Sequence, residues 1–150
     1  MHATGWKVGY CVARKQLSSE LRKVHQYLTF ATSTPMQQAI AEYLIEEPAH
    51  YRTLGAFYQD RRDYFATALS TTAFRPLTCH GTYFQLAEYT EISTQADTDF
   101  CRSLTTEHGV AAIPISVFYA HPPPQQHIVR FCFAKEYATL DEAITRLRSI

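Results

Sequence analysis

The sequence has no long apolar run and no surplus of charge of either sign. Its longest apolar stretches, residues 110–113 and 128–134, are far shorter than the roughly 20 residues that cross a bilayer. Fourteen basic side chains balance fourteen acidic ones, so no excess positive charge is available to neutralise a phosphate backbone or an anionic membrane. The first residues also lack the charged and apolar regions of a secretory signal. We therefore expect a cytoplasmic protein that binds neither nucleic acid nor membrane.

Several motifs of catalytic and metal sites are also missing. The sequence contains no G-x-S-x-G, no G-x-G-x-x-G, no P-loop and no H-E-x-x-H, which argues against a serine-hydrolase elbow, a dinucleotide turn, a triphosphate cradle and a zinc protease. The four cysteines stand singly, without C-x-x-C spacing, as is typical of small apolar side chains in a reducing compartment. We expect neither a disulfide framework nor a metal site.

The length and composition of the chain are those of a folded domain. The chain has 150 residues, of which 46% are hydrophobic, and 20 are Phe, Tyr or Trp. This length is usual for one domain, and the aromatic content suits a large core, a subunit interface or a pocket for a planar ligand. Composition alone does not choose among these three uses.

The first third of the chain indicates one strand followed by helices. Residues 6–13 are apolar and predict a buried strand, and residues 17–30 predict an amphipathic helix behind Ser18 and Ser19 as possible caps. Thr34-Pro35 predicts a helix start with Thr34 as N-cap. A long helix is expected from Pro48 over some 24 residues. The second of these helices is expected to bury five side chains: Met36, Ala39, Ile40, Tyr43 and Leu44.

After residue 73 the pattern changes to short strands around helices. Strands are expected at 74–77, 83–88, 110–113 and 128–133, and helices at 97–108 and from a capping box at Thr139. This alternation predicts an α/β fold in which residues 73–150 form a two-layer sandwich. Residues 1–47 have one strand and two helices, too little to bury a sheet by themselves. The front of the chain therefore resembles the end of a larger domain.

Arg130 is the most informative single residue, because its permanent charge lies within the apolar strand Ile-Val-Arg-Phe-Cys-Phe. A guanidinium in such surroundings requires an anion. That anion is either one of the chain's own carboxylates, in a buried ion pair, or the carboxylate of a ligand held through two parallel hydrogen bonds. Sequence spacing leaves both readings open.

Lys7 is a second candidate for contact with an anion. It lies in Gly-Trp-Lys-Val-Gly, where the glycines allow a ligand to approach the backbone closely and the ammonium could meet a phosphate. A solvated lysine on an edge strand is the competing reading. Only four lysines occur in the chain, and the other three lie in polar surroundings.

Six motifs in order resemble the C-terminal part of class I/II aminotransferases, the fold-type-I enzymes that use pyridoxal phosphate. They are Thr-Gly-Trp-Lys-Val-Gly-Tyr (4–10), His-Gln-Tyr-Leu-Thr-Phe (25–30), Thr-Pro-Met-Gln (34–37), Gly-Thr-Tyr-Phe (81–84), Gly-Val-Ala-Ala-Ile-Pro (109–114) and Val-Arg-Phe-Cys-Phe-Ala-Lys (129–135). The resemblance is strongest to the methionine and kynurenine aminotransferases. Each motif alone is weak, whereas their joint order along the chain is specific.

The resemblance implies roles for three residues. Lys7 matches a lysine that contacts the cofactor phosphate, and Arg130 matches the arginine that binds the α-carboxylate of the substrate. Phe30 resembles an aromatic residue that one subunit of a homodimer lends to its neighbour's pocket, where it favours apolar side chains such as that of methionine. The implied reaction is transamination between an amino acid and a 2-oxo acid with pyridoxal 5'-phosphate as cofactor.

The same resemblance implies that the catalytic lysine is absent from this chain. In relatives the Schiff-base lysine stands in Ser-x-x-Lys-Thr, eight residues before the lysine matched by Lys7, and only six residues precede Lys7 here. We therefore expect residues 1–47 to be the end of the large cofactor domain, 48–72 the connecting helix and 73–150 the small domain. On this interpretation the chain is a truncated aminotransferase without activity of its own.

Two other classes of function stay open at this stage. The chain could be a non-catalytic interaction module whose exposed apolar face docks on another chain, such as a separately made N-terminal piece. It could also be a small carboxylate-binding domain that uses Arg130. Co-purification with such a piece favours the first alternative, and titration with an amino acid or 2-oxo acid favours the second.

Overall fold

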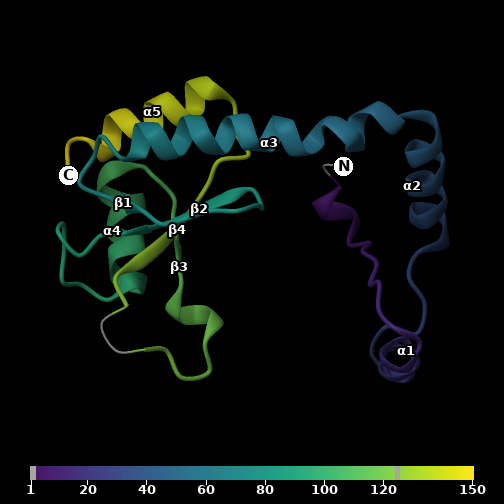
Figure 1. Ribbon diagram of the computed structural model, residues 1–150. Helices are drawn as coiled ribbons and strands as arrows, with labels where there is room; N and C mark the ends of the chain where they lie inside the picture. The colour runs from purple at the N-terminus through teal and green to yellow at the C-terminus, as the bar shows by residue number, and fades with distance from the viewer. Residues whose placement is uncertain (1–2, 124–125) are drawn as a thin grey trace. The chain divides into compact units, whose positions relative to one another are not determined.

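A computed structural model describes residues 3–123 and 126–150. The chain divides into two compact units, Met1–Gly55 and Ala56–Ile150. Helix α3 (Pro48–Leu69) runs from one unit into the other (Figure 1). No helix in the described residues is both long enough and apolar enough to cross a membrane.

The first unit is built from helices and extended chain. A short 3-10 turn, η1 (Thr4–Trp6), precedes α1 (Lys15–Leu28) and α2 (Thr34–Glu46). The predicted helices are confirmed, but the predicted strand at 6–13 is wrong, because a strand requires a hydrogen-bonded neighbour and the described residues offer it none. Helix α2 begins one residue earlier than expected, with Ser33 rather than Thr34 at the N-cap.

No described residue of α1 or α2 is buried. Helix α1 carries an apolar stripe at helical spacing, and all four of its members are exposed: Leu17, Leu21, Val24 and Leu28. In α2, Met36 and Leu44 are exposed and the other three expected core residues are half-buried. The expectation that α2 buries an apolar face is therefore wrong within this unit. The amphipathic pattern is present, but nothing in the unit covers it.

The second unit contains a four-stranded antiparallel sheet in the order β1-β2-β4-β3. Its strands are β1 (Arg75–Pro76), β2 (Phe84–Glu88), β3 (Ile113–Pro114) and β4 (Ile128–Cys132). The central pair sets the register, with Leu86 opposite Arg130. Because side chains alternate across a strand, Arg130 and Leu86 lie on one face, and Phe131 and Val129 lie on the other.

One face of this sheet forms the core with the helices. Phe131 packs against Phe65 of α3 and against Phe74, which in turn contacts Phe100 of α4. Helix α4 (Asp97–His108) has the predicted boundaries, and α5 (Tyr137–Leu147) contributes Leu140, Ile144 and Leu147 to the core. Helices α3 and α5 lie side by side (Figure 1), joined by hydrogen bonds from Tyr64 to Asp141 and from Arg148 to Thr71. The expected α/β sandwich is confirmed.

At the ends of two helices, one capping motif in the sequence predicted the helix boundary correctly and another did not. Gly109 follows α4 in the left-handed conformation, with φ of 65°, and its N–H caps the helix by donating to Leu104. The predicted capping box at Thr139 is wrong, because α5 begins two residues earlier and the N–H of Thr139 already donates to the carbonyl of Glu136.

Candidate functional site

Arg130 lies near the middle of the sheet, on the face opposite the aromatic core. Its strand, β4, is paired on both sides there, with Leu86 of β2 and Ile113 of β3 opposite it. Two neighbouring strands fix the backbone from which the side chain projects. The guanidinium is therefore presented from the most rigid part of the second unit.

The partners of the Arg130 side chain are aromatic rings rather than carboxylates. Its guanidinium carbon lies 4.6 Å from the centroid of Phe84 and 5.2 Å from the centroid of Phe118. Among the described residues no carboxylate forms an ion pair with it. Rings above a planar guanidinium restrict its orientation and leave its N–H donors free. The internal ion pair that the sequence left open is not present in the described residues.

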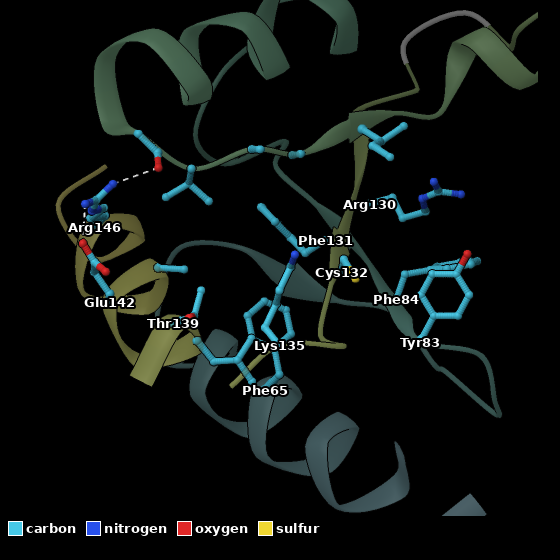
Figure 2. A pocket seen from close by; sticks show the side chains of 17 residues that line it. Phe65, Tyr83, Phe84, Arg130, Phe131, Cys132, Lys135, Thr139, Glu142 and Arg146 are labelled. Carbon is cyan, nitrogen blue, oxygen red and sulfur yellow. Dashed lines mark hydrogen bonds and ion pairs between the residues drawn. The ribbon is translucent and has the colours of Figure 1, made fainter. Parts of the chain in front are cut away.

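A cavity of about 480 Å³ adjoins this side chain. In Figure 2, Arg130 lies at one end with Tyr83 and Phe84, and Arg146 lies at the other end. Arg146 is already engaged: it donates to the carbonyl of Gly109 over 2.8 Å and forms an ion pair with Glu142. Of the cavity's two arginines, Arg146 is thus paired with a carboxylate of the chain, whereas Arg130 has no such partner among the described residues.

A tyrosine hydroxyl group, that of Tyr58, has a raised pKa in this region. Burial raises the pKa of Tyr58 of α3, and the nearby thiol of Cys132 raises it further. Cys132 is exposed and lies opposite Phe84 in the sheet, on the same face as Arg130. The phenol of Tyr58 therefore stays protonated at neutral pH.

Lys7 and Phe30 belong to the first unit, and the structure describes their local surroundings there. Lys7 is exposed and caps η1 through its backbone N–H, which donates to the carbonyl of Thr4. Among the described residues no carboxylate pairs with its ammonium. Phe30 follows α1 with its ring 81% exposed. The exposed ammonium of Lys7 is accessible to a phosphate, and the exposed side chain of Phe30 is accessible to a second subunit. Both contacts stay predictions.

Backbone strain coincides with these candidate residues. Among the described residues, the non-glycine residues with positive φ are Lys7 (54°), Phe30 (65°) and Thr82 (68°). This conformation is uncommon for any side chain and is unfavourable for a bulky one such as Phe30. Thr82 lies two residues before Phe84, whose ring contacts Arg130. Strained backbone is enriched at functional sites, so the pattern supports the choice of Lys7 and Phe30 as candidates.

Sequence reasoning missed Phe118 and the role of Phe84. Phe84 stood in the motif Gly-Thr-Tyr-Phe, and alternation along its strand places it on the Arg130 face. Phe118 belongs to a 3-10 turn, η2 (Ser116–Phe118), just after the motif that ends at Pro114. No local pattern shows that this turn returns to Arg130, since the contact spans 12 residues and depends on strand pairing.

Comparison with known proteins gives this arrangement a context. Residues 1–147 match the sequence profile of aminotransferase class I and II. The chain belongs to this family. It is 53% identical over 149 residues to a methionine aminotransferase of Escherichia coli, and 33% identical over 161 residues to a kynurenine–oxoglutarate transaminase of Dictyostelium discoideum. These matches cover 99% and 93% of this chain, but only 38% and 37% of the relatives.

Solved structures of aminotransferases share the fold. The crystal structure of an Escherichia coli protein with a methionine aminotransferase function matches with a TM-score of 0.85 and 53% identity, over 99% of this chain and 39% of that one. N-Succinyldiaminopimelate aminotransferase from Mycobacterium tuberculosis matches with a TM-score of 0.83 and 37% identity, over 98% of this chain and 38% of that one. The chain thus corresponds to less than two fifths of each aminotransferase, and the predicted fold class is confirmed.

Proposed function

We propose that this chain carries the substrate-carboxylate site of a pyridoxal-phosphate-dependent aminotransferase, with Arg130 as the residue that binds the carboxylate. The observation that carries the proposal is the guanidinium of Arg130, which lies close to two aromatic rings and has no acidic partner in the described residues. A charge in such a position is stabilised by a ligand anion. Family membership supports the acid group of an amino acid or a 2-oxo acid as that anion.

One arginine serves both halves of a transamination. The amino acid and the 2-oxo acid differ at Cα but share the carboxylate next to it. Two parallel N–H donors hold this group in one plane, which fixes the direction of the bonds to Cα. The nearby rings of Phe84 and Phe118 restrict the orientation of the guanidinium from which these hydrogen bonds are donated.

The substrate side chain is proposed to be apolar, with L-methionine as the leading candidate. The relative with 53% identity is named a methionine aminotransferase. Apolar and aromatic residues also contribute to the lining of the cavity that adjoins Arg130, among them Tyr83, Phe84 and Ile113. These walls suit a thioether or an aromatic ring better than a second carboxylate.

Pyridoxal phosphate, when bound, supplies the electron sink for removing the proton from Cα. Of the residues in this chain, Lys7 is proposed to contact its phosphate, because the Lys7 ammonium is exposed and unpaired within the described residues. No lysine of the chain matches the one that holds the cofactor covalently in the family. We therefore propose that these 150 residues alone do not catalyse transamination.

The family is dimeric in general, and Phe30 is proposed to act across a dimer interface. Its ring is exposed although its backbone is held in the left-handed conformation at φ of 65°. An uncovered ring on a fixed backbone suits insertion into the pocket of a second copy of the chain. A cytoplasmic location is proposed with this function.

The proposal is tested by ligand titration of the 150-residue chain. L-Methionine is compared with L-methioninol, which has the same side chain and amino group but no carboxylate. We expect L-methionine to bind at least about tenfold more tightly, and Arg130→Gln to abolish this preference. Arg102→Gln is the matched control, because Arg102 is an exposed arginine of α4 in the same unit.

Two results would count against the proposal. Equal binding of methionine and methioninol would show that the carboxylate is not recognised. A preference that survives Arg130→Gln would place the carboxylate elsewhere. Separately, formation of the 2-oxo acid of methionine by this chain with added cofactor and an amino acceptor would contradict the proposed lack of activity.

A further inference from the structure

We propose that Asp97 is a positioning residue for the carboxylate site, acting through Ser116 to hold the ring of Phe118 against Arg130. The inference rests on the proposed function of Arg130 and extends it to residues that do not touch a substrate. It starts from the buried carboxylate of Asp97, which lies in the first turn of helix α4. Asp97 is only 4% exposed.

Both carboxylate oxygens of Asp97 are used by one residue. Oδ2 accepts a hydrogen bond of 2.6 Å from the backbone N–H of Ser116, and Oδ1 accepts one of 2.6 Å from its hydroxyl group. An aspartate in the first turn of a helix ordinarily accepts from that helix's own N–H groups. Asp97 lies in the first turn of α4, yet both of these bonds go to Ser116 of η2, 19 residues away. These bonds therefore fix a turn rather than cap a helix.

The turn that Asp97 fixes carries the ring over Arg130. Ser116 begins η2 and Phe118 ends it, so the hydrogen-bonded residue lies two positions before the ring. This turn is the green helical segment that follows β3 in Figure 1. Phe118 is 62% exposed, so the packing of its own side chain holds it only weakly. The place of the ring is thus determined by the backbone of η2, and the backbone of η2 by Asp97.

The two rings near Arg130, those of Phe84 and Phe118, differ in how the chain holds them. Phe84 projects from β2, which pairs with β4 along its whole length, with Phe84 opposite Cys132, and with β1 at its far end. Phe118 projects from a three-residue turn, for which the Asp97 carboxylate supplies charge-assisted hydrogen bonds from outside the loop. Loss of Asp97 should therefore weaken the contact of the guanidinium with Phe118 and leave its contact with Phe84 in place.

The test compares Asp97→Ala with Asp99→Ala in the full 150-residue chain. Both remove a carboxylate from the first turn of α4, but Asp99 is exposed and does not contact η2. The first readout needs no ligand: nuclear Overhauser contacts between the Phe118 ring and the Arg130 side chain, measured by NMR. We expect these contacts in the parent chain and in Asp99→Ala, and their loss in Asp97→Ala. Ser116→Ala, which keeps the backbone N–H, should weaken them and still fold.

The second readout is affinity for L-methionine at a temperature where every variant is folded. Asp97→Ala should bind about three- to tenfold more weakly, the range expected for loss of one cation–π partner. Asp97→Asn, which can still accept from the Ser116 N–H, should recover part of the loss. A merely structural role would lower the unfolding temperature without changing affinity among folded variants.

The two proposals fail in different ways. If the Phe118–Arg130 contacts persist in folded Asp97→Ala and Ser116→Ala, the positioning role is overturned whether or not the chain binds methionine. If those contacts disappear as expected but the parent chain does not prefer methionine over methioninol, the positioning of Phe118 stands and the carboxylate site fails.

Discussion

The two units of this chain differ in how much of their apolar surface they bury. In the second unit, Ala56–Ile150, Phe65, Phe131 and Phe133 are each no more than 3% exposed within one continuous core. In the first unit, Met1–Gly55, α1 and α2 contain no buried residue. Since burial of apolar surface is the main force that stabilises a fold, the second unit has its own source of stability and the first depends on contacts outside itself.

This difference bears on function, because it separates the candidate site residues. Arg130 projects from the sheet of the second unit, where strands β2 and β3 pair with its own strand. Lys7 follows η1 and Phe30 follows α1 in the first unit, where both have left-handed backbone and neither is buried. We therefore expect the second unit to present its part of the site correctly in this chain. Lys7 and Phe30 require further polypeptide around them.

The largest expected effect comes from matched truncations in the two units. Phe131→Ala removes a core ring that packs against Phe65 and Phe74 and should lower the free energy of unfolding by about 3–5 kcal/mol. Leu21→Ala, in the exposed stripe of α1, should change it by less than about 0.5 kcal/mol. Urea unfolding followed by circular dichroism measures both. A large effect of Leu21→Ala would show that the first unit has a core of its own.

A pair of glycines should give effects of opposite sign. Gly109→Ala places a Cβ 2.4 Å from Nη1 of Arg146 at a backbone φ of 65°. It should destabilise the second unit by about 1–3 kcal/mol, through strain and loss of the Arg146 contact. At Gly55 in α3 an added Cβ meets no atom within 4 Å. Gly55→Ala should stabilise the helix by up to about 1 kcal/mol. Thermal unfolding of both variants against the parent chain decides the signs.

A structural feature could be predicted from the sequence when neighbouring residues determine it, and could not when it depends on residues far apart in the chain. The boundaries of α4 were predictable because Gly109 ends the helix through its own conformation. The strand expected at 6–13 was wrong, because apolar composition cannot show whether a partner strand is present. Lys7, Phe30 and Arg130 were proposed as site residues from their motifs, and these roles stay predictions. Phe118 and Asp97 could not be found, since their contacts join segments that lie far apart along the chain.

A further difference concerns pH and the thiols. Burial, with the negative charge of Asp97 adding to it, raises the pKa of Cys101 from an ordinary value of 9.0 to about 12. Between these values the folded chain keeps the proton and the unfolded chain has released it. The stability of the second unit should therefore fall as the pH rises above 9 towards 12. Cys101→Ala should make this fall less steep in unfolding measured at several pH values.

The same burial predicts selective alkylation. At pH 8 iodoacetamide should modify the exposed Cys11 and Cys132 while leaving Cys101 unmodified, as peptide mass spectrometry would show. Cys11 and Cys132 lie in different units and serve as internal controls for access. Rapid modification of Cys101 under native conditions would contradict the core described for the second unit.

The central claim is that the guanidinium of Arg130 is free to bind a ligand carboxylate, and NMR of its Nε–H group tests this most directly. Addition of L-methionine to the 150-residue chain should shift the Arg130 Nε–H resonance, with saturation, and leave that of Arg102 in place. L-Methioninol should shift neither. If the Arg130 resonance does not respond to methionine while the chain is folded, or responds equally to methioninol, the account of the site is wrong.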